Sequence, residues 1–374
     1  MTRAMNRAKW SAQVAMAGAT MLLGCESRGT ALTAERMRGG NVIVRNWDEL
    51  FRGYEIPFAA PEGERPIQRI GRVTLNREAE VIVPDVRANR LLVLDTLGAR
   101  RAVLSLPIPP SPVETPSAIA MGDQRLAHLF IPAKGMVVVH DIVANRVVRR
   151  INVDGPVTDL LPMADSGYVL YSPSHPDGVV RRVDRNGRLI RAALPIVDER
   201  VRIFHGRTQN GGIAALGDTA ILVVEPSRFA LHRLKSSLRG GVSYFGDSTS
   251  DAAFYAKAMP PELAPDDLKK QHSIWWDSFR HADRPFVLQD SLVLVSHYTS
   301  RGLWKSTYQV SIVTMQGELI AEGMSVPYGG RVIGVRGRTV IVGVPPRLLA
   351  SGDSLSAYRL FQFTFQWPRS LSAM

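Results

Sequence analysis

Short runs of Val, Ile and Leu recur along the chain, and most of them stop at or just before a proline. The five prolines that mark these stops are Pro84, Pro132, Pro173, Pro226 and Pro345. A sixth run, Leu292–Val295, ends near His297 without a proline. Because proline cannot donate to a strand ladder, we expect each run to be a β-strand that ends at its proline.

A second aliphatic run, a tight turn and a third run follow these strands. The turns include Leu97-Gly98, Arg185-Asn186-Gly187 and Met315-Gln316-Gly317. Asn-Gly is a strong hairpin signal because both residues tolerate a positive φ. The pattern therefore predicts several antiparallel strands in each repeat.

Repeats of about 40 to 50 residues with several strands each are typical of a β-propeller. The pattern gives six units, at residues 70–115, 116–156, 157–200, 201–246, 286–328 and 329–367. Residues Asn41 to Phe58, which include Val42-Ile43-Val44, are expected to add a strand to the last blade and close the ring, since an open sheet edge invites aggregation. We therefore predict an all-β, six-bladed β-propeller over residues 41–367.

The order of strand, Asp, small turn, Gly, Arg and aliphatic residue, as in residues 179–190, resembles the six-bladed propellers of the NHL and TolB type, which include bacterial lipoproteins. The resemblance covers nearly all of the chain after the N-terminal segment, and it implies the fold without implying an activity. Two alternatives stay open. One is a β-sandwich pair or an irregular all-β protein, and the other is a seven-bladed ring in which residues 240–285 form a degenerate blade.

An insertion at about residues 246–285, between blades four and five, lacks the alternating aliphatic runs. We expect it to be partly helical from Asp266 to His281, because Pro265 and two aspartates suit a helix start. Its bulky apolar residues include Trp275 and Trp276. A long loop is where function usually concentrates, so we expect the insertion to cap the mouth of the central channel.

The second and fourth strands of an antiparallel meander end on the same face of the ring, so the cap and the proline-marked turns share a face. Aromatic side chains at a channel mouth suit sugar stacking or a protein anchor, although the two tryptophans could equally hold the cap on the propeller. The candidate binding residues of this capped face are Trp275, Trp276, His175, His297, Tyr298, Arg90 and Arg228.

Neither a metal site nor a cofactor site is predicted. Of the candidate ligands His272, Asp277, His281 and Asp283, only Asp277 and His281 are one helical turn apart. No Gly-x-Ser-x-Gly elbow, His-Glu-x-x-His pair, Walker loop, Cys-x-x-Cys pair or EF-hand loop is present. Catalytic residues therefore stay unassigned.

The N-terminal residues have the parts of a secretory signal: three basic residues, then an apolar run from Val14 to Leu23. Leu22-Leu23-Gly24-Cys25 resembles a bacterial lipobox, which implies cleavage after Gly24 and acylation of Cys25. We therefore expect a signal peptide at residues 1–24 and a lipidated, flexible tether at residues 25–40. Glu26 after the cysteine favours the outer membrane. A plain secretory signal and an uncleaved anchor are the alternatives, but the run is shorter than the roughly 20 residues that span a bilayer.

Charge and composition add little to this picture. The formal net charge is +12, and arginines are spread along the chain, which fits a codon bias toward arginine or an attraction to anionic lipid or polysaccharide. Cys25 is the only cysteine, so the fold has no disulfide. An envelope location makes nucleic acid an improbable partner.

The sequence favours a non-catalytic binding or scaffolding propeller, anchored to the cell envelope by its lipid, with a protein or polysaccharide partner. The alternative is a propeller hydrolase or lyase that acts on a sugar, lactone or peptide. Such enzymes use acidic ligands from several blades, and this chain has Asp85, Asp177 and Glu225 near strand ends.

Overall fold

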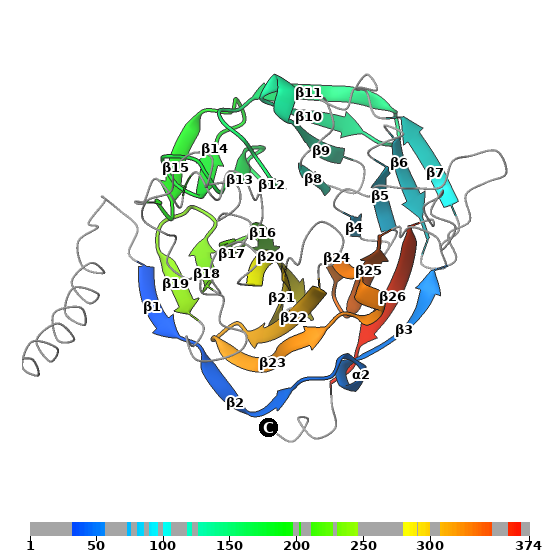
Figure 1. Ribbon diagram of the computed structural model, residues 1–374. Coiled ribbons are helices and arrows are strands. Elements are labelled where there is room, and N and C mark those ends of the chain that lie inside the picture. Colours follow the sequence, from blue (N-terminus) through cyan, green and yellow to red (C-terminus); the bar gives the residue numbers. More distant parts are fainter. Residues whose placement is uncertain are drawn as a thin grey trace, which may run out of the picture.

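A computed structural model describes residues 32–56, 73–75, 81–85, 90–95, 100–105, 118–121, 126–196, 202, 211–226, 230–245, 280–289, 291–299, 307–345 and 358–367. These residues form strands almost throughout, arranged as a ring of sheets (Figure 1). The predicted all-β propeller fold is confirmed. None of the helices in these segments has the length and apolar character that a membrane span requires.

Hydrogen bonds join the described strands into six sheets, numbered here in chain order. Sheet 1 contains β4 (Thr74–Leu75), β5 (Val81–Asp85), β6 (Arg90–Leu94) and β7 (Arg100–Ser105). Sheet 2 contains β8 (Ala118–Met121), β9 (Leu126–Ile131), β10 (Met136–Asp141) and β11 (Arg146–Asn152). Sheet 3 contains β12 (Asp159–Pro162), β13 (Tyr168–Tyr171), β14 (Val180–Val183) and β15 (Leu189–Ala193).

The other three sheets each include one strand from the N-terminal part of the chain. Sheet 4 contains β16 (Gly212–Leu216), β17 (Ala220–Val224), β18 (Ala230–Lys235), β19 (Gly241–Phe245) and β1 (Leu32–Arg36). Sheet 5 contains β20 (Arg280–Leu288), β21 (Leu292–Thr299), β22 (Thr307–Thr314), β23 (Glu318–Ser325) and β2 (Arg38–Val44). Sheet 6 contains β24 (Arg331–Arg336), β25 (Thr339–Val344), β26 (Arg359–Phe365) and β3 (Phe51–Ile56).

The innermost strands β4, β8, β12, β16, β20 and β24 line the centre of the ring. Each of these strands contacts the next one, and β24 contacts β4, so the series of contacts closes into a ring. The first four strands of each sheet, counted from the centre, run antiparallel to their neighbours. The connections between second and third strands, and those between successive sheets, therefore lie on one face, which we call the loop face. The remaining hairpins lie on the opposite face, the turn face.

Prolines end the second strands as the sequence predicts in four of the five cases. The strands β9, β13, β17 and β25 all stop before their proline, whereas β5 includes Pro84 and ends one residue later, at Asp85. The Asn186-Gly187 hairpin is also confirmed between β14 and β15. Gly187 has φ +84°, and the Asp184 carboxylate accepts the backbone N–H groups of Asn186 and Arg188.

The N-terminal strands form a strap along the outer edges of sheets 4, 5 and 6 (Figure 1). β1 pairs in parallel with β19, β2 pairs in parallel with β23, and β3 pairs antiparallel with β26. A flexible tether is predicted for residues 25–40, but from residue 32 onward the chain forms β1 and β2 instead. The reason is that the edges of sheets 4 and 5 offer unpaired backbone groups, with which this part of the chain pairs. The segment Val42–Val44 lies on sheet 5, and the added strand of the last sheet is β3.

The predicted helix from Asp266 to His281 is wrong at its C-terminal end. Arg280 and His281 begin β20, which continues through residue 285 and so removes residues 280–285 from the insertion. The reason is the length of β21, which reaches Thr299 and provides backbone partners for Arg280 and His281. Residues 246–279 lie outside the described residues.

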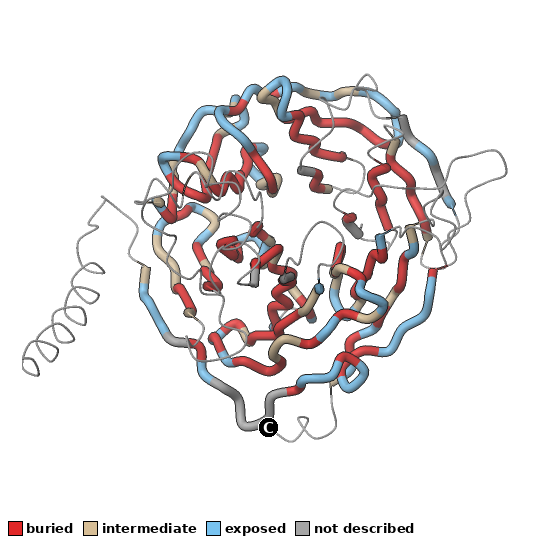
Figure 2. Tube along the Cα trace, in the orientation of Figure 1, coloured by how far each residue is buried: buried red, intermediate tan, exposed pale blue. Residues whose placement is uncertain are grey.

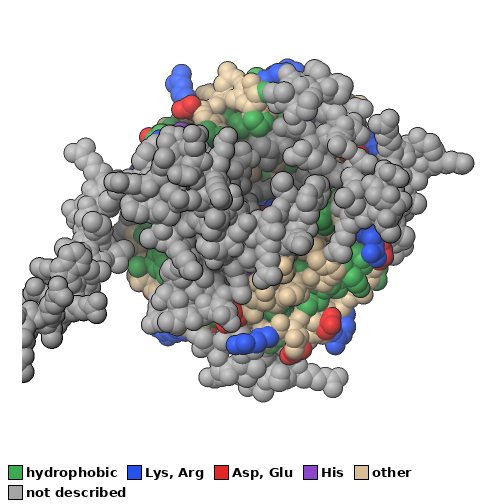
Figure 3. Space-filling view, in the orientation of Figure 1, with side chains coloured by type: hydrophobic (Ala, Val, Ile, Leu, Met, Phe, Trp, Pro, Cys, Tyr) green, Lys and Arg blue, Asp and Glu red, His purple; other side chains and the backbone are tan. Residues whose placement is uncertain are grey.

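Burial follows the ring from the inside outward: the inner and middle strands are buried, and the exposed positions gather on the outermost strands and the strap (Figure 2). Described Lys and Arg side chains are dispersed around the rim on the face shown in Figure 3. The basic charge therefore forms no single patch among the described residues of this face.

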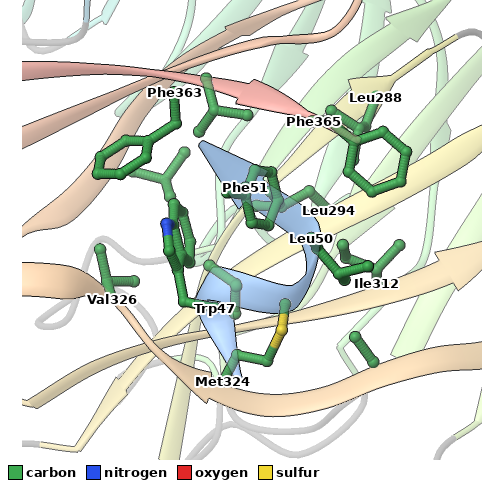
Figure 4. Packing of buried hydrophobic residues seen from close by; sticks show 14 of the residues in the cluster. Trp47, Leu50, Phe51, Leu288, Leu294, Ile312, Met324, Val326, Phe363 and Phe365 are labelled. Atoms are coloured by element: carbon green, nitrogen blue, oxygen red, sulfur yellow. The ribbon is translucent and has the colours of Figure 1, made fainter. Parts of the chain in front are cut away.

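A short helix in the strap, α2 (Trp47–Leu50), anchors it to the core between sheets 5 and 6 (Figure 4). The Trp47 ring stacks on Phe51 with centroids 4.2 Å apart and meets the edge of Phe363 at 5.1 Å. Leu50 and Phe51 are fully buried among residues of both sheets, including Leu294 and Phe365. The strap is therefore part of the hydrophobic core.

Candidate functional site

Charged side chains at the loop-face ends of the innermost strands pair between sheets. Asp159 is the first residue of β12 and is fully buried. One carboxylate oxygen lies 3.1 Å from Arg284 Nη2 on β20, and the other accepts the Ile213 backbone N–H on β16 at 3.0 Å. This carboxylate therefore joins sheets 3, 4 and 5.

A second pair, Asp283 and Arg331, joins sheets 5 and 6. Asp283 lies at a bulge in β20, where the pairing with β21 shifts by one residue. The Arg331 guanidinium meets both carboxylate oxygens, with Nε 2.7 Å from Oδ2 and Nη2 2.5 Å from Oδ1. Burial alone would lower the pKa of Arg331. The negative charge and the hydrogen bonds of Asp283 outweigh this effect, so the pKa is raised. The side chain is 41% exposed, so it combines a fixed orientation with access from the loop face.

Arg331 interacts electrostatically with two tyrosines, Tyr308 and Tyr358. Burial raises the pKa of Tyr308 and raises that of Tyr358 to about 12, and Arg331 opposes both shifts. Both phenols are therefore neutral at physiological pH. Together with Arg331 they provide a cation and hydroxyl groups, which suit hydrogen bonding to a polar ligand.

The predicted residue His175 lies in the connection between β13 and β14 and is buried. Burial, together with the positive charge of Arg181, lowers the pKa of His175, and Asp154 and Asp177, each 3.8 Å away, oppose this only in part. Arg181 is itself buried and donates to the Ser172 hydroxyl at 2.9 Å. His175 is therefore neutral and packed beside a buried cation.

Glu225, His232 and Ser243 form a hydrogen-bonded chain in sheet 4. Glu225 Oε1 lies 2.8 Å from His232 Nε2, and Ser243 Oγ lies 2.7 Å from His232 Nδ1. These are the residue types of a serine triad, but the two ring nitrogens are exchanged relative to the usual arrangement, in which Nε2 faces the serine. Ser243 is 3% exposed. In this structure these hydrogen bonds join paired residues of β18 and β19 to the residue that follows β17.

The other predicted site residues are placed as follows. Arg90 begins β6 on the loop face and pairs with Asp85 at 3.1 Å. His297 is fully buried within β21, with Nε2 3.2 Å from the Ser311 hydroxyl, so it lies in a strand and not in a turn. Tyr298 is the next residue of the same strand. Outside the described residues lie Trp275, Trp276, Arg228, His272, Asp277 and Cys25.

Among the described parts of the chain, no group of three His, Cys, Asp or Glu side chains is arranged to hold a metal ion. His281 and Asp283, two of the ligands considered from the sequence, both lie in β20. Asp283 is bound to Arg331, which gives it a structural partner.

The ion pairs that use Asp159, Arg284 and Arg331 are not among the features predicted from the sequence. The available signal was a charged residue at or near the start of a short aliphatic run, as at Asp159-Leu160-Leu161 and Arg331-Val332-Ile333. A charge in that position has to be satisfied by a partner when the strand is buried. The partner itself is far away in the sequence, so the pattern alone cannot name it.

No protein-family model matches this chain, and no curated protein matches it. Among solved structures, a Bacteroides fragilis protein named as exported has a TM-score of 0.59 at 11% identity, over 90% of this chain and 100% of the other. A member of the DUF4221 family from Bacteroides vulgatus has a TM-score of 0.56 at 8% identity, over 85% and 98% of the two chains. At these identities the likeness shows the propeller fold alone. Virginiamycin B lyase from Staphylococcus aureus, with a TM-score of 0.45 at 11% identity over 82% of each chain, is too distant to carry an argument.

Proposed function

We propose that this protein is a six-bladed propeller of the cell envelope that binds a protein or polysaccharide partner through its loop face, without catalysis. The observation that carries the proposal is the asymmetry of the two faces. The loop face has the long connections, such as those between β3 and β4, between β19 and β20, and between β25 and β26. The turn face has tight hairpins, such as the one between β14 and β15.

The pairs Asp159–Arg284 and Asp283–Arg331 support a rigid platform beneath these connections. They fix the loop-face ends of four successive innermost strands, β12, β16, β20 and β24. A rigid scaffold that carries variable connections is a common way to build a recognition surface. Contacts of each innermost strand with the next support a closed ring of six blades.

An envelope location and a lipid anchor at Cys25 are part of this proposal. The lipobox-like residues Leu22–Cys25 support the anchor, and the fold shared with a protein named as exported supports export. Multiple acyl chains give stable anchoring, whereas one chain is marginal. Cells fed an alkyne-labelled palmitate should label the full-length protein and not the Cys25→Ser variant; equal labelling of both would contradict the anchor.

Crosslinking in cells tests the binding function. Full-length protein is compared with a variant in which residues 247–278 are replaced by a short Gly-Ser linker, which leaves Phe245 and Arg280 in their strands. A matched control replaces residues 122–125, which connect β8 to β9 on the turn face, with the same kind of linker. We expect a defined partner to copurify with the wild type and the control but not with the loop-face variant, while all three stay folded by circular dichroism.

Retention of the partner by the folded loop-face variant would move the interface away from this connection. If no partner is enriched in any sample, the binding proposal fails and a small-molecule substrate becomes the better hypothesis.

A propeller hydrolase is the second candidate function, and the Glu225–His232–Ser243 chain is the feature that favours it. An activated serine reacts with a fluorophosphonate probe. Labelling of the native protein that is lost in Ser243→Ala would support a hydrolase. The absence of labelling would mean that the Glu225–His232–Ser243 hydrogen bonds have a structural role only.

A further inference from the structure

The turn face contains a cavity of about 570 Å³ that none of the features above uses. Residues of sheets 2 and 3 line it, and the β16–β17 hairpin of sheet 4 closes one side. Its volume lies within the range of small-molecule sites, about 300–1,000 Å³. All its lining residues belong to the described part of the chain.

Most of the wall is apolar. Met121 and Leu126 come from the β8–β9 hairpin, and Leu161 and Met163 come from the β12–β13 hairpin. Val148 of β11 is 54% exposed and adds to the same wall. Apolar side chains that line a cavity open to solvent suit the apolar body of a ligand.

Polar groups converge in one part of the cavity. The Tyr168 hydroxyl lies 2.9 Å from His128 Nδ1 and accepts a hydrogen bond from Arg149 Nη2 at 3.3 Å. Arg149 Nη2 also donates to the Ser166 carbonyl at 3.1 Å. Burial raises the pKa of Tyr168, with Arg149 opposing, so the phenol is neutral and does not neutralise the guanidinium.

Arg149 is the cation of this cavity, and none of the described carboxylates lies within ion-pair distance of it. Both of its hydrogen bonds to described residues use Nη2, which orients the guanidinium and leaves Nε and Nη1 without an acceptor among those residues. Either bidentate fork of a guanidinium needs Nη2, so a carboxylate here takes a single charge-assisted hydrogen bond, from Nε or from Nη1, together with the attraction of the positive charge.

Asp218, in the β16–β17 hairpin, also lines the cavity and is exposed. It adds one negative charge to the lining, which disfavours a ligand with a second anionic group. The cavity therefore presents one cation, one separate carboxylate and a broad apolar wall.

We infer that this cavity binds a small monocarboxylate with an apolar body, whose carboxylate meets Arg149 and whose body lies against Met121, Leu126, Leu161 and Met163. Tyr168 and Ser166 act as positioning residues for the guanidinium. The site is on the face opposite to the proposed partner-binding surface, so the two proposals stand or fall separately.

Calorimetric titration of the folded protein tests the site. The probes are dodecanoate and 2-naphthoate, used below any micelle concentration, which separate an aliphatic from an aromatic body. Dodecanol and dodecyltrimethylammonium have the same tail as dodecanoate without its charge or with the opposite charge. We expect at least one carboxylate to bind, and the two comparators to bind at least tenfold more weakly.

Substitutions then locate the head group. Arg149→Gln should weaken binding of the carboxylate at least tenfold, and Arg149→Lys should have an intermediate effect because it keeps the charge but not the orientation that Tyr168 and Ser166 give the guanidinium. Arg150→Gln, at an exposed arginine of β11 that does not line the cavity, is the matched control and should bind like the wild type. Thermal melts show whether each variant is folded.

Three results would overturn the inference: neither carboxylate binds, the alcohol or the ammonium binds as well as dodecanoate, or folded Arg149→Gln binds like the wild type.

Discussion

The ring has a strapped half and an open half. In sheets 4, 5 and 6 the strands β1, β2 and β3 cover the outermost strand of the meander. In sheets 1, 2 and 3 the outermost strands β7, β11 and β15 have no further strand beside them among the described residues. The two halves therefore solve the problem of an unpaired sheet edge in different ways.

The strand sequences reflect this difference. Of the strands that the strap covers, β19 and β23 contain no arginine and β26 contains one, Arg359. The open strands β7 and β11 carry Arg100 and Arg101, and Arg146, Arg149 and Arg150, respectively. Charged side chains on an edge strand discourage pairing with another molecule. Part of the basic composition thus has a structural use in the open half, whereas the strapped half uses its own backbone.

The largest expected effect comes from the core contact of the strap. Phe51→Ala should lower the free energy of unfolding by about 3–5 kcal/mol, because it removes a fully buried ring between sheets 5 and 6. Tyr54→Ala, in the same strand but 47% exposed, is the control and should change it by less than about 1 kcal/mol. Urea denaturation measures both. A loss at Phe51 no larger than at Tyr54 would show that the strap is dispensable.

Removing the Asp159 carboxylate, which connects sheet 3 of the open half to sheets 4 and 5 of the strapped half, should have the next largest effect on the free energy of unfolding. Asp159→Ala leaves the Arg284 guanidinium and the Ile213 N–H without their buried acceptor, so we expect a loss of about 3 kcal/mol. Asp218→Ala, an exposed aspartate in the β16–β17 hairpin, serves as the control. Chemical denaturation followed by tryptophan fluorescence reports both values. A neutral result for Asp159→Ala would mean that hydrophobic packing alone joins sheet 3 to sheet 4.

Acid should weaken the open half. His175 and His140 both lie there, and burial lowers the pKa of each below 6.5, the usual histidine value. The unfolded chain therefore takes up the proton first: their stabilising effect is complete above pH 6.5 and is lost as the pH falls through the folded pKa values. Each contributes a slope of at most about 1.4 kcal/mol per pH unit.

Denaturant titrations between pH 7.5 and 5 test this. The double variant His140→Gln with His175→Gln should show a flatter stability profile over that range than the wild type. An unchanged profile would assign the acid sensitivity to carboxylates elsewhere.

The smallest effect on stability is expected at the open edge. Arg146 and Arg150 are exposed on β11, so replacing both with valine should change the free energy of unfolding by about 0.5 kcal/mol or less. The variant should instead self-associate, because Arg149 would be the one charged residue left on β11. Light scattering at increasing protein concentration measures this, with Arg188→Val and Arg191→Val on sheet 3 as a second test. A monodisperse variant would show that arginine is not what protects this edge.

The strands and their order could be predicted from the sequence because each depends on local signals. Aliphatic runs, the prolines after β9 and β25, and the Asn186-Gly187 turn act within a few residues. The strap could not be predicted in detail, since Val42–Val44 is as good a strand for sheet 6 as for sheet 5, and only the three-dimensional path decides. The same holds for Asp159 and Arg284: their chemistry is visible in the sequence, but their proximity depends on closure of the ring.

The strap also sets the order in which the ring can be completed. During synthesis β1, β2 and β3 emerge before the other strands, but their partners β19, β23 and β26 end at residues 245, 325 and 365. The strands β1, β2 and β3 therefore remain unpaired until nearly all the rest of the chain has emerged. Contacts between residues so far apart in the sequence are typical of slowly folding proteins. A chain cut short before β26 leaves β3 without its antiparallel partner, and the exposed segment would mark an incomplete molecule for proteolysis.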